Sequence, residues 1–172
     1  PGARAALARL AHSDLAVVII TNQAVINRGL VSVEAVEDIH RRMTRAIQVA
    51  GGRVDGVLYC PHRPDEGCGC RKPQPGLLLQ AARELDVDLS RSYIIGDAWS
   101  DMQAGQAVGC QCYLVLTGRG RRQFLECVRK GYSGFRLAWN LGDAIRMILM
   151  QERVSDRLPR KMSPSLTGGV SR

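Results

Sequence analysis

Short apolar runs alternate with amphipathic stretches along most of this chain, and this alternation most restricts the fold. Runs rich in β-branched or aromatic residues predict strands at 15–20, 56–59, 92–95, 112–116 and 135–139. Apolar residues at three- and four-residue steps predict helices at 1–11, 32–50, 75–85, 99–108, 123–130 and 141–150. Strands that alternate with helices imply a parallel sheet with helices on both faces. We therefore predict an α/β fold, a three-layer α/β/α Rossmann-like sheet, within residues 1–150.

The segment between the second strand and the following helix is rich in metal-binding side chains. Cys60 and His62 are followed, after a stretch of turn-forming residues, by Cys68 and Cys70. Three thiolates and an imidazole are an accepted ligand set for tetrahedral Zn²⁺, and four protein ligands leave no open position for catalysis. Buried core thiols are the alternative, but glycine, proline and charged neighbours favour a structural zinc loop.

Polar side chains follow the predicted strands at their carboxyl ends, where ligands gather in parallel sheets. Thr21 and Asn22 offer a hydroxyl, an amide and backbone N–H groups to a phosphate, or form a simple polar turn. Asp97 either binds Mg²⁺ through its carboxylate or caps the next helix. Directly after the zinc loop, Arg71 and Lys72 have side chains suited to phosphate oxygens. We expect these groups to meet at one edge of the sheet.

Two further features have equally open interpretations. Asp101 lies one helical turn beyond Asp97, where it either supports the metal site or favours the start of the helix. Trp99 either lines the site or packs against neighbouring helices. Cys110 and Cys112 span a turn between helix and strand, and we expect them in the core.

Composition and charge narrow the possible partners. The chain has 172 residues and a formal charge of +8, but only 5% aromatic residues. Residues 118–130 carry a net charge of +4 and residues 151–172 a net charge of +3, which leaves the main body nearly neutral. This distribution favours a solvated helix and a basic, disordered tail at 151–172 over a nucleic-acid-binding face. We expect no nucleic-acid or membrane partner, and a monomer.

Cysteine usage and the first residues bear on location. No signal peptide is evident at the start, so we expect a reducing cytoplasm in which the six cysteines are metal ligands or core thiols. The sequence opens with Pro1 inside a predicted helix. We therefore expect it to begin within a larger protein.

Three segments together resemble the haloacid dehalogenase (HAD) superfamily of phosphatases. They are residues 19–23 (Ile-Ile-Thr-Asn-Gln), residues 60–73 with the cysteine loop and Arg-Lys-Pro, and residues 95–102 with Ile-Gly-Asp and Asp-Met. Thr-Gly-Arg-Gly at 117–120 is also similar to a strand exit of this family. The resemblance covers about residues 1–150. Within the superfamily, the chain resembles the heptose bisphosphate phosphatases and, next, the histidinol-phosphate phosphatases.

The resemblance implies a role for each matching residue. Thr21 and Asn22 would bind the transferring phosphoryl group, and Lys72 would neutralise it. Asp97 would bind Mg²⁺. Zinc would be held by Cys60, His62, Cys68 and Cys70. Substrate contacts would come from Gln23, Ala24, Arg71 and position 98, where this chain has Ala98 and several heptose phosphatases have a lysine.

The family's Asp-x-Asp-Gly-Thr segment, which supplies the nucleophile and the general acid/base, does not occur in these residues. The resemblance places it upstream of Pro1, on the central strand. We therefore expect a Mg²⁺-dependent phosphatase that removes the 7-phosphate of a small sugar phosphate, heptose 1,7-bisphosphate, with these 172 residues inactive on their own. The alternatives are a histidinol-phosphate phosphatase and a non-catalytic zinc-bearing binding module.

Overall fold

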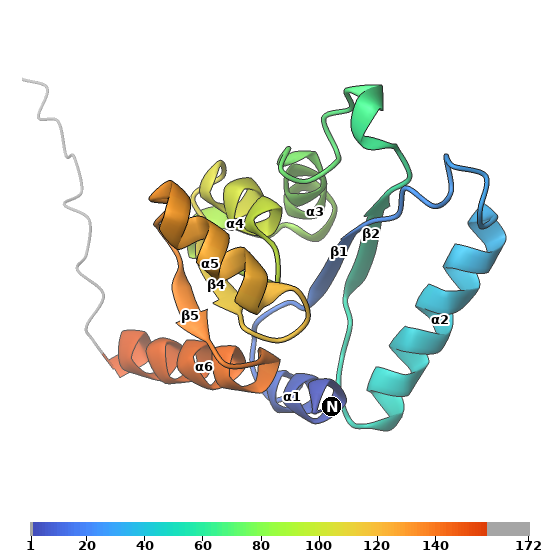
Figure 1. The fold of residues 1–172 in the computed structure, drawn as a ribbon. Coiled ribbons are helices and arrows are strands. Elements are labelled where there is room, and N and C mark those ends of the chain that lie inside the picture. Colours follow the sequence, from blue (N-terminus) through green and yellow to red (C-terminus); the bar gives the residue numbers. More distant parts are fainter. Residues whose placement is uncertain (1, 158–172) are drawn as a thin grey trace, which may run out of the picture.

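A computed structural model describes residues 2–157 of the chain (Figure 1). Its helices are α1 (Ala3–Leu10), α2 (Val33–Val49), α3 (Gly76–Leu85), α4 (Trp99–Gln106), α5 (Gly120–Lys130) and α6 (Leu141–Arg157). Its strands are β1 (Val18–Asn22), β2 (Gly56–Cys60), β3 (Tyr93–Gly96), β4 (Gln111–Val115) and β5 (Arg136–Ala138). Short 3-10 turns lie at Pro64–Glu66 and Leu89–Arg91. Each predicted strand and helix is present, so the alternation identified the elements correctly.

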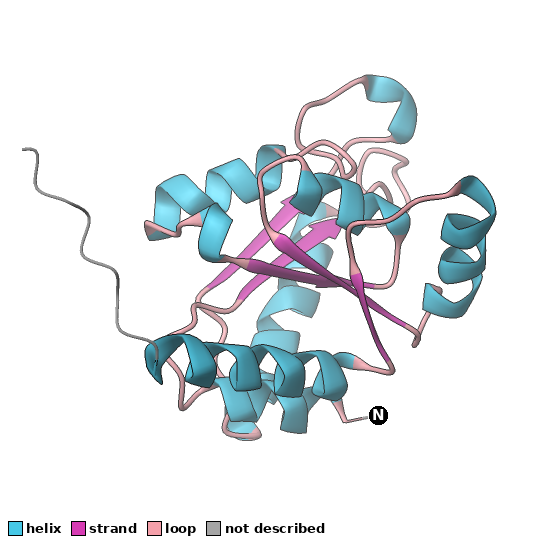
Figure 2. Cartoon of the chain, turned by 90° about the vertical axis from the view of Figure 1, so that its left-hand side faces the viewer, coloured by secondary structure: helices cyan, strands magenta, loops and turns pink. Residues whose placement is uncertain are grey.

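All strand pairs in the described residues are parallel, as predicted. β1 pairs with β2, while β4 pairs with β3 on one side and with β5 on the other. Alternate residues of β4 face opposite layers: Tyr113 and Val115 pack with residues of α6, whereas Cys112 and Leu114 pack near Met102 of α4. The sheet is therefore covered on both faces, which confirms the three-layer α/β/α fold (Figure 2).

The strands form two sheets because β1 and β3 do not pair within the described residues. We call the space between these two strands the slot. A cavity of about 900 Å³ lies along it toward α1, α2 and α6, and a cavity of about 850 Å³ lies along it toward α3. Both cavities are lined by residues of β1 and of β3. The slot therefore opens to both helical layers.

The first strand differs from its prediction. Residues 15–20 were expected to form a strand buried on both faces, but β1 begins at Val18 and all its residues are only half-buried. The reason is the slot, because one edge of β1 has no neighbouring strand in the described part of the chain. By contrast, β4 has a strand on each side, and its residues from Cys112 to Val115 are buried.

The last helix is longer than predicted. The basic tail was expected to be disordered from residue 151, but α6 continues to Arg157. Polar contacts hold this extension against the sheet: Tyr93 donates to Glu152, and Gln151 Oε1 accepts from Arg136 Nη1 at 2.9 Å. Residues 158–172 lie outside the described part of the chain. No helix of the described part is long and apolar enough to cross a membrane.

Candidate active site

The four predicted zinc ligands lie together at the end of β2. Cys60 is the last residue of this strand, and the loop after it folds back so that Cys68 and Cys70 approach Cys60 and His62. Their candidate ligand atoms all lie within 4.8 Å of one another, and the sulfur–sulfur distances are 3.1–3.5 Å. Zn–S bonds of about 2.3 Å in a tetrahedron separate sulfurs by ~3.8 Å. The cluster therefore needs only a slight expansion to hold Zn²⁺.

The thiols of this cluster have very different proton affinities. Burial, reinforced by the Cys70 thiol, raises the pKa of Cys60 to about 12. Burial acts in the same direction on Cys68, but hydrogen bonds from Cys70, from backbone N–H groups and from Cys60 outweigh it and lower that pKa to about 7. One thiolate is therefore accessible near neutral pH, and a bound metal would stabilise the others in the ionised form that ligation requires.

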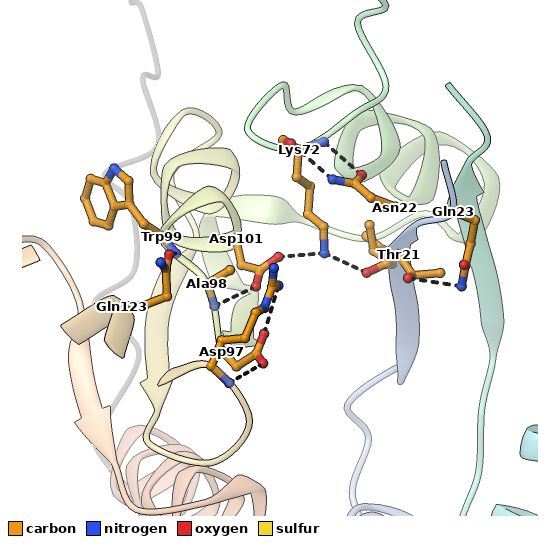
Figure 3. A network of polar contacts seen from close by, with 11 residues as sticks. Thr21, Asn22, Gln23, Lys72, Asp97, Ala98, Trp99, Asp101 and Gln123 are labelled. Carbon is orange, nitrogen blue, oxygen red and sulfur yellow. Dashed lines mark hydrogen bonds and ion pairs between the residues drawn. The ribbon is translucent and has the colours of Figure 1, made fainter. Parts of the chain in front are cut away.

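Lys72 extends from the end of the cysteine loop across to the other sheet. Its backbone N–H donates to Asn22 Oδ1 and its carbonyl accepts from Asn22 Nδ2, both at 3.1 Å. Its ammonium group lies 2.6 Å from Asp101 Oδ1 and donates to the Ile20 carbonyl at 2.8 Å (Figure 3). Only 13% of the Lys72 side chain is exposed. The structure therefore fixes one cation beside Thr21 and Asn22, at the carboxyl end of β1.

Asp101 takes the helix-start role considered for it and also forms an ion pair with Lys72. One carboxylate oxygen pairs with Lys72, and the other accepts the Ala98 backbone N–H at 3.1 Å at the start of α4. Gly96 has to be a glycine here, because a Cβ at this position would lie 2.3 Å from Asp101 Oδ2. The end of β3 therefore packs directly against the carboxylate that orients Lys72.

Asp97 lies just beyond β3 and is partly exposed. Its Oδ2 accepts the backbone N–H of Arg119 at 3.0 Å, and its Oδ1 accepts from Arg119 Nη2 at 3.2 Å. Burial alone would raise the pKa of this carboxyl group, but the bonds and charge of Arg119 outweigh burial and hold the pKa below its ordinary value. Asp97 is thus an ionised oxygen donor at neutral pH, which is the ligand type that Mg²⁺ prefers.

These groups meet at one cavity. The cavity of about 850 Å³ is lined at its polar end by Thr21, Asn22, Arg71, Lys72, Asp97 and Arg119. They lie at the end of β1 and in the loops that follow β2, β3 and β4, so the parallel arrangement gathers them as expected. Figure 3 shows Thr21 and Asn22 on one side of Lys72, and Asp97 and Asp101 on the other.

Three of the residues expected to contact substrate do not line this cavity. Gln23 instead donates from its side chain to Thr21 Oγ1 at 3.4 Å, and Ala24 follows it in the loop after β1. Ala98 is only 3% exposed, so its methyl group is not presented to the cavity. Trp99 points away from Lys72 and stacks on Tyr132 with ring centroids 4.4 Å apart (Figure 3). Of its two interpretations, helix packing is the correct one.

Arg119 is the site residue that the sequence analysis missed. The segment containing it, Thr-Gly-Arg-Gly at 117–120, was noted only as a strand exit. The position of Arg119 after a strand could have indicated its role. In a parallel sheet, the loop after β4 lies beside the loop after β3, because Gly96 is paired with Leu114. A cation in that loop is therefore expected next to Asp97.

The chain is similar in sequence to a known family and to named relatives. A model of the HAD-hydrolase-like family matches residues 69–144, and together with the relatives that follow it places the chain in the class of HAD-like hydrolases. The D-glycero-beta-D-manno-heptose-1,7-bisphosphate 7-phosphatase of Bordetella bronchiseptica is 46% identical over 126 residues, which are 73% of this chain and 70% of the relative. The enzyme of the same name from Pseudomonas aeruginosa is 43% identical over 122 residues, covering 71% and 68%.

A solved structure agrees with these relatives. The B. bronchiseptica D,D-heptose 1,7-bisphosphate phosphatase, crystallised with magnesium and phosphate, superposes with a TM-score of 0.81 at 40% identity, covering 88% of this chain and 83% of that one. The chain belongs to the family of the D-glycero-beta-D-manno-heptose-1,7-bisphosphate 7-phosphatases. This confirms the resemblance stated from the sequence, and it favours the heptose phosphatases over the histidinol-phosphate phosphatases.

Proposed function

We propose that the protein is a Mg²⁺-dependent phosphatase that removes the 7-phosphate of D-glycero-D-manno-heptose 1,7-bisphosphate. The observation that carries the proposal is the cavity where Thr21, Asn22, Lys72 and Asp97 meet. It offers neutral donors, a fixed cation and an ionised carboxylate, the groups that phosphoryl transfer needs for positioning and charge stabilisation. The identity of the sugar in this proposal comes from the names of the relatives.

Each group has a proposed task at the transferring phosphate. Asn22 orients the Lys72 backbone through two hydrogen bonds, and Thr21 adds a hydroxyl at the strand end. The Lys72 ammonium, held by Asp101 and the Ile20 carbonyl, neutralises charge on the phosphoryl oxygens. Asp97 would hold Mg²⁺, which when bound neutralises further phosphate charge. A metal of this kind usually needs one or two carboxylates together with phosphate, so Asp97 fits as one ligand.

We propose that the nucleophile comes from a segment outside these 172 residues, because Asp-x-Asp-Gly-Thr does not occur in them. We propose that a parallel strand carrying it fills the slot. Among the described residues, the facing edges of β1 and β3 both have backbone groups without a strand partner. Side chains of such a strand would alternate between the two cavities along the slot. Its carboxyl end would then lie between Thr21 and Asp97.

The test compares this chain with a version extended upstream by a strand ending in Asp-x-Asp-Gly-Thr. We expect phosphate release from heptose 1,7-bisphosphate with Mg²⁺ only from the extended protein. The matched control is the extended protein with the first aspartate changed to asparagine, which should be inactive. Within the extended protein, Lys72→Met should lower kcat by roughly 10²–10³.

The outcomes separate the hypotheses. Turnover by the 172-residue chain alone would exclude a nucleophile from the added strand. No turnover by a folded, zinc-loaded extended protein would instead favour the non-catalytic zinc module. Extension should also raise Tm, since a strand in the slot would bury the half-exposed residues of β1.

The cysteines bear on where the protein is located. Three thiols must stay reduced to ligate zinc, and all six cysteines are free in the structure. We therefore propose a reducing compartment, the cytoplasm, and a monomeric enzyme acting on a small phosphorylated sugar. Gel filtration of the zinc-loaded protein tests the monomer directly.

A further inference from the structure

Three cations line the active-site cavity, and they differ in how firmly they are held. Lys72 is buried between Asp101 and the Ile20 carbonyl. Arg71 donates from its guanidinium to the His62 carbonyl at 3.1 Å, which ties it to the cysteine loop. Arg119 is different: 71% of its side chain is exposed, and Asp97 is the one partner of its guanidinium among the described residues.

The Asp97 carboxylate does not depend on the Arg119 side chain for its orientation. The backbone N–H of Arg119 holds the other carboxylate oxygen at 3.0 Å. Gly118 allows this close approach, since it has a φ of +60° and a Cβ there would lie 2.4 Å from Asp97 Oδ2. The guanidinium can therefore leave while the carboxylate stays in place.

We propose that Arg119 exchanges partners during the catalytic cycle, from Asp97 in the metal-free site to the substrate phosphate that is not transferred. This inference rests on the proposed function, because it takes Mg²⁺ and a bisphosphate as ligands. A divalent cation at Asp97 competes with the guanidinium for the same carboxylate and repels it at short range. A freed guanidinium has a planar fork of donors that matches phosphate bidentately.

The exchange makes Arg119 a specificity-determining residue. Lys72 is fixed at the strand ends, beside the groups proposed to bind the transferred phosphate, whereas Arg119 lies on an exposed loop at the rim. A sugar with a second phosphate gains the Arg119 contact, and a sugar with one phosphate does not. Arg119 also keeps Asp97 neutralised until the metal arrives.

Two opposite effects of one substitution test the exchange. Arg119→Ala removes the competing cation, so Mg²⁺ should bind about 2–5-fold more tightly. It also removes the second phosphate contact, so heptose 1,7-bisphosphate should bind roughly tenfold or more weakly, while heptose 7-phosphate changes little. Arg119→Lys keeps the charge without the fork and should restore the metal competition but only part of the bisphosphate preference.

The measurement is calorimetry on the zinc-loaded protein extended upstream by the Asp-x-Asp-Gly-Thr strand, with the first aspartate of that segment changed to asparagine so that substrate binds without turnover. Mg²⁺ is titrated alone, and each sugar phosphate is then titrated at saturating Mg²⁺. Arg122→Ala is the matched control, because it removes an exposed arginine a short distance along the same segment and should leave all three affinities unchanged.

The results discriminate between the two proposals. If Mg²⁺ binds wild type and Arg119→Ala equally, or does not bind wild type, the exchange is wrong whatever the sugars do. An unchanged preference for the bisphosphate in Arg119→Ala also overturns it. If Mg²⁺ binds more tightly to the variant but wild type binds neither sugar phosphate, the Mg²⁺ titration supports the competition at Asp97. The proposed substrate is then wrong.

Discussion

The two sheets divide the molecule into halves that are stabilised in different ways. The three-stranded half, with β3, β4, β5, α4, α5 and α6, has a conventional core: all three buried apolar clusters of the described residues include its side chains, and Tyr113 and Leu114 of β4 are fully buried. In the two-stranded half, the residues of β1 are half-buried, and α2 exposes Ile39 and Val49 by 58% and 81%.

The two-stranded half nevertheless carries most of the proposed phosphate-binding groups. Two polar interactions, rather than a large core, hold these groups in place. The cysteine cluster holds the loop to the end of β2, and Lys72 forms an ion pair with Asp101 in the other half (Figure 3). The comparison shows that a site can be ordered by a metal cluster and an ion pair where an unfilled slot limits apolar burial. The metal cluster and the ion pair can each be removed by a separate substitution.

Removing the metal cluster should have the largest effect. We expect Cys70→Ser to abolish zinc binding and to lower the free energy of unfolding by more than about 5 kcal/mol, because metal-binding energy contributes directly to folding at such sites. The loss should be local. Hydrogen exchange should show lost protection of β2, the cysteine loop and α3, with β4 still protected.

Cys127→Ser is the matched control for this prediction. Cys127 is fully buried in α5 and belongs to the other half. This variant should keep one zinc per chain and lose protection around α5 instead. Full zinc occupancy in Cys70→Ser, or equal loss of protection in both halves, would show that the cluster does not support the two-stranded half selectively.

Breaking the ion pair between the halves should be the next largest effect. Lys72→Met leaves the Asp101 charge buried, at 9% side-chain exposure, without its partner. Loss of one member of a buried pair costs about 3–5 kcal/mol, and a second change, Asp101→Asn, should recover part of it. Urea denaturation of both variants measures the difference.

An exposed pair of similar length provides the control. Lys130 and Glu126 lie 2.8 Å apart on α5, with side-chain exposures of 52% and 45%. Lys130→Met should cost less than about 1 kcal/mol. If Lys72→Met and Lys130→Met lower the free energy of unfolding equally, the ion pair of Lys72 does not stabilise the contact between the halves.

Alkaline pH should weaken the three-stranded half. Burial raises the pKa of both Cys110 and Cys112 from 9.0 to about 11. Between these values the unfolded chain loses a proton that the folded protein keeps, so stability is full below pH 9 and falls as pH rises toward 11. The loss is on the order of 3 kcal/mol per thiol.

The pH slope, rather than the stability itself, identifies the cause. Cys112→Ala should make the decline between pH 9 and 11 shallower. Val115→Ala, on the same buried strand, also loses packing but has no group that titrates, and it should keep the wild-type slope. An unchanged slope in Cys112→Ala would assign the alkaline loss to other groups.

The same contrast explains how much the sequence could predict. Local periodicity found every helix and strand of the described residues, and the donor types in residues 60–70 predicted a zinc cluster that the structure brings together. Local periodicity placed β1 too early in the sequence, because Thr21 and Asn22 become strand residues through pairing with Tyr59 and Cys60. Pairing across many residues leaves no local signal.

Arg119 was harder to foresee for a related reason. An exposed arginine after a strand looks solvated in sequence, and only the neighbouring positions of β3 and β4 bring it to Asp97. The unpaired edges of β1 and β3 in the described residues were expected only through the family resemblance, which places the missing strand at the centre of the sheet. Such features follow from topology more than from residue type.

Removing the ion pair between Arg119 and Asp97 should have the smallest effect on the free energy of unfolding, in contrast to removing the Lys72 pair. Arg119→Ala should change the free energy of unfolding by less than about 1 kcal/mol, because 71% of its side chain is exposed. Since Arg119 holds the Asp97 pKa below 3.8, the pair stabilises the fold above that pH, and this contribution is lost as pH falls through the lowered value. The small difference between wild type and variant should therefore vanish in strong acid. Arg41→Ala, at an exposed pair with Asp38, gives the reference cost. A cost of 3 kcal/mol or more for Arg119→Ala, about the range of a buried pair, would mean that this guanidinium is fixed like Lys72 and not free to exchange partners.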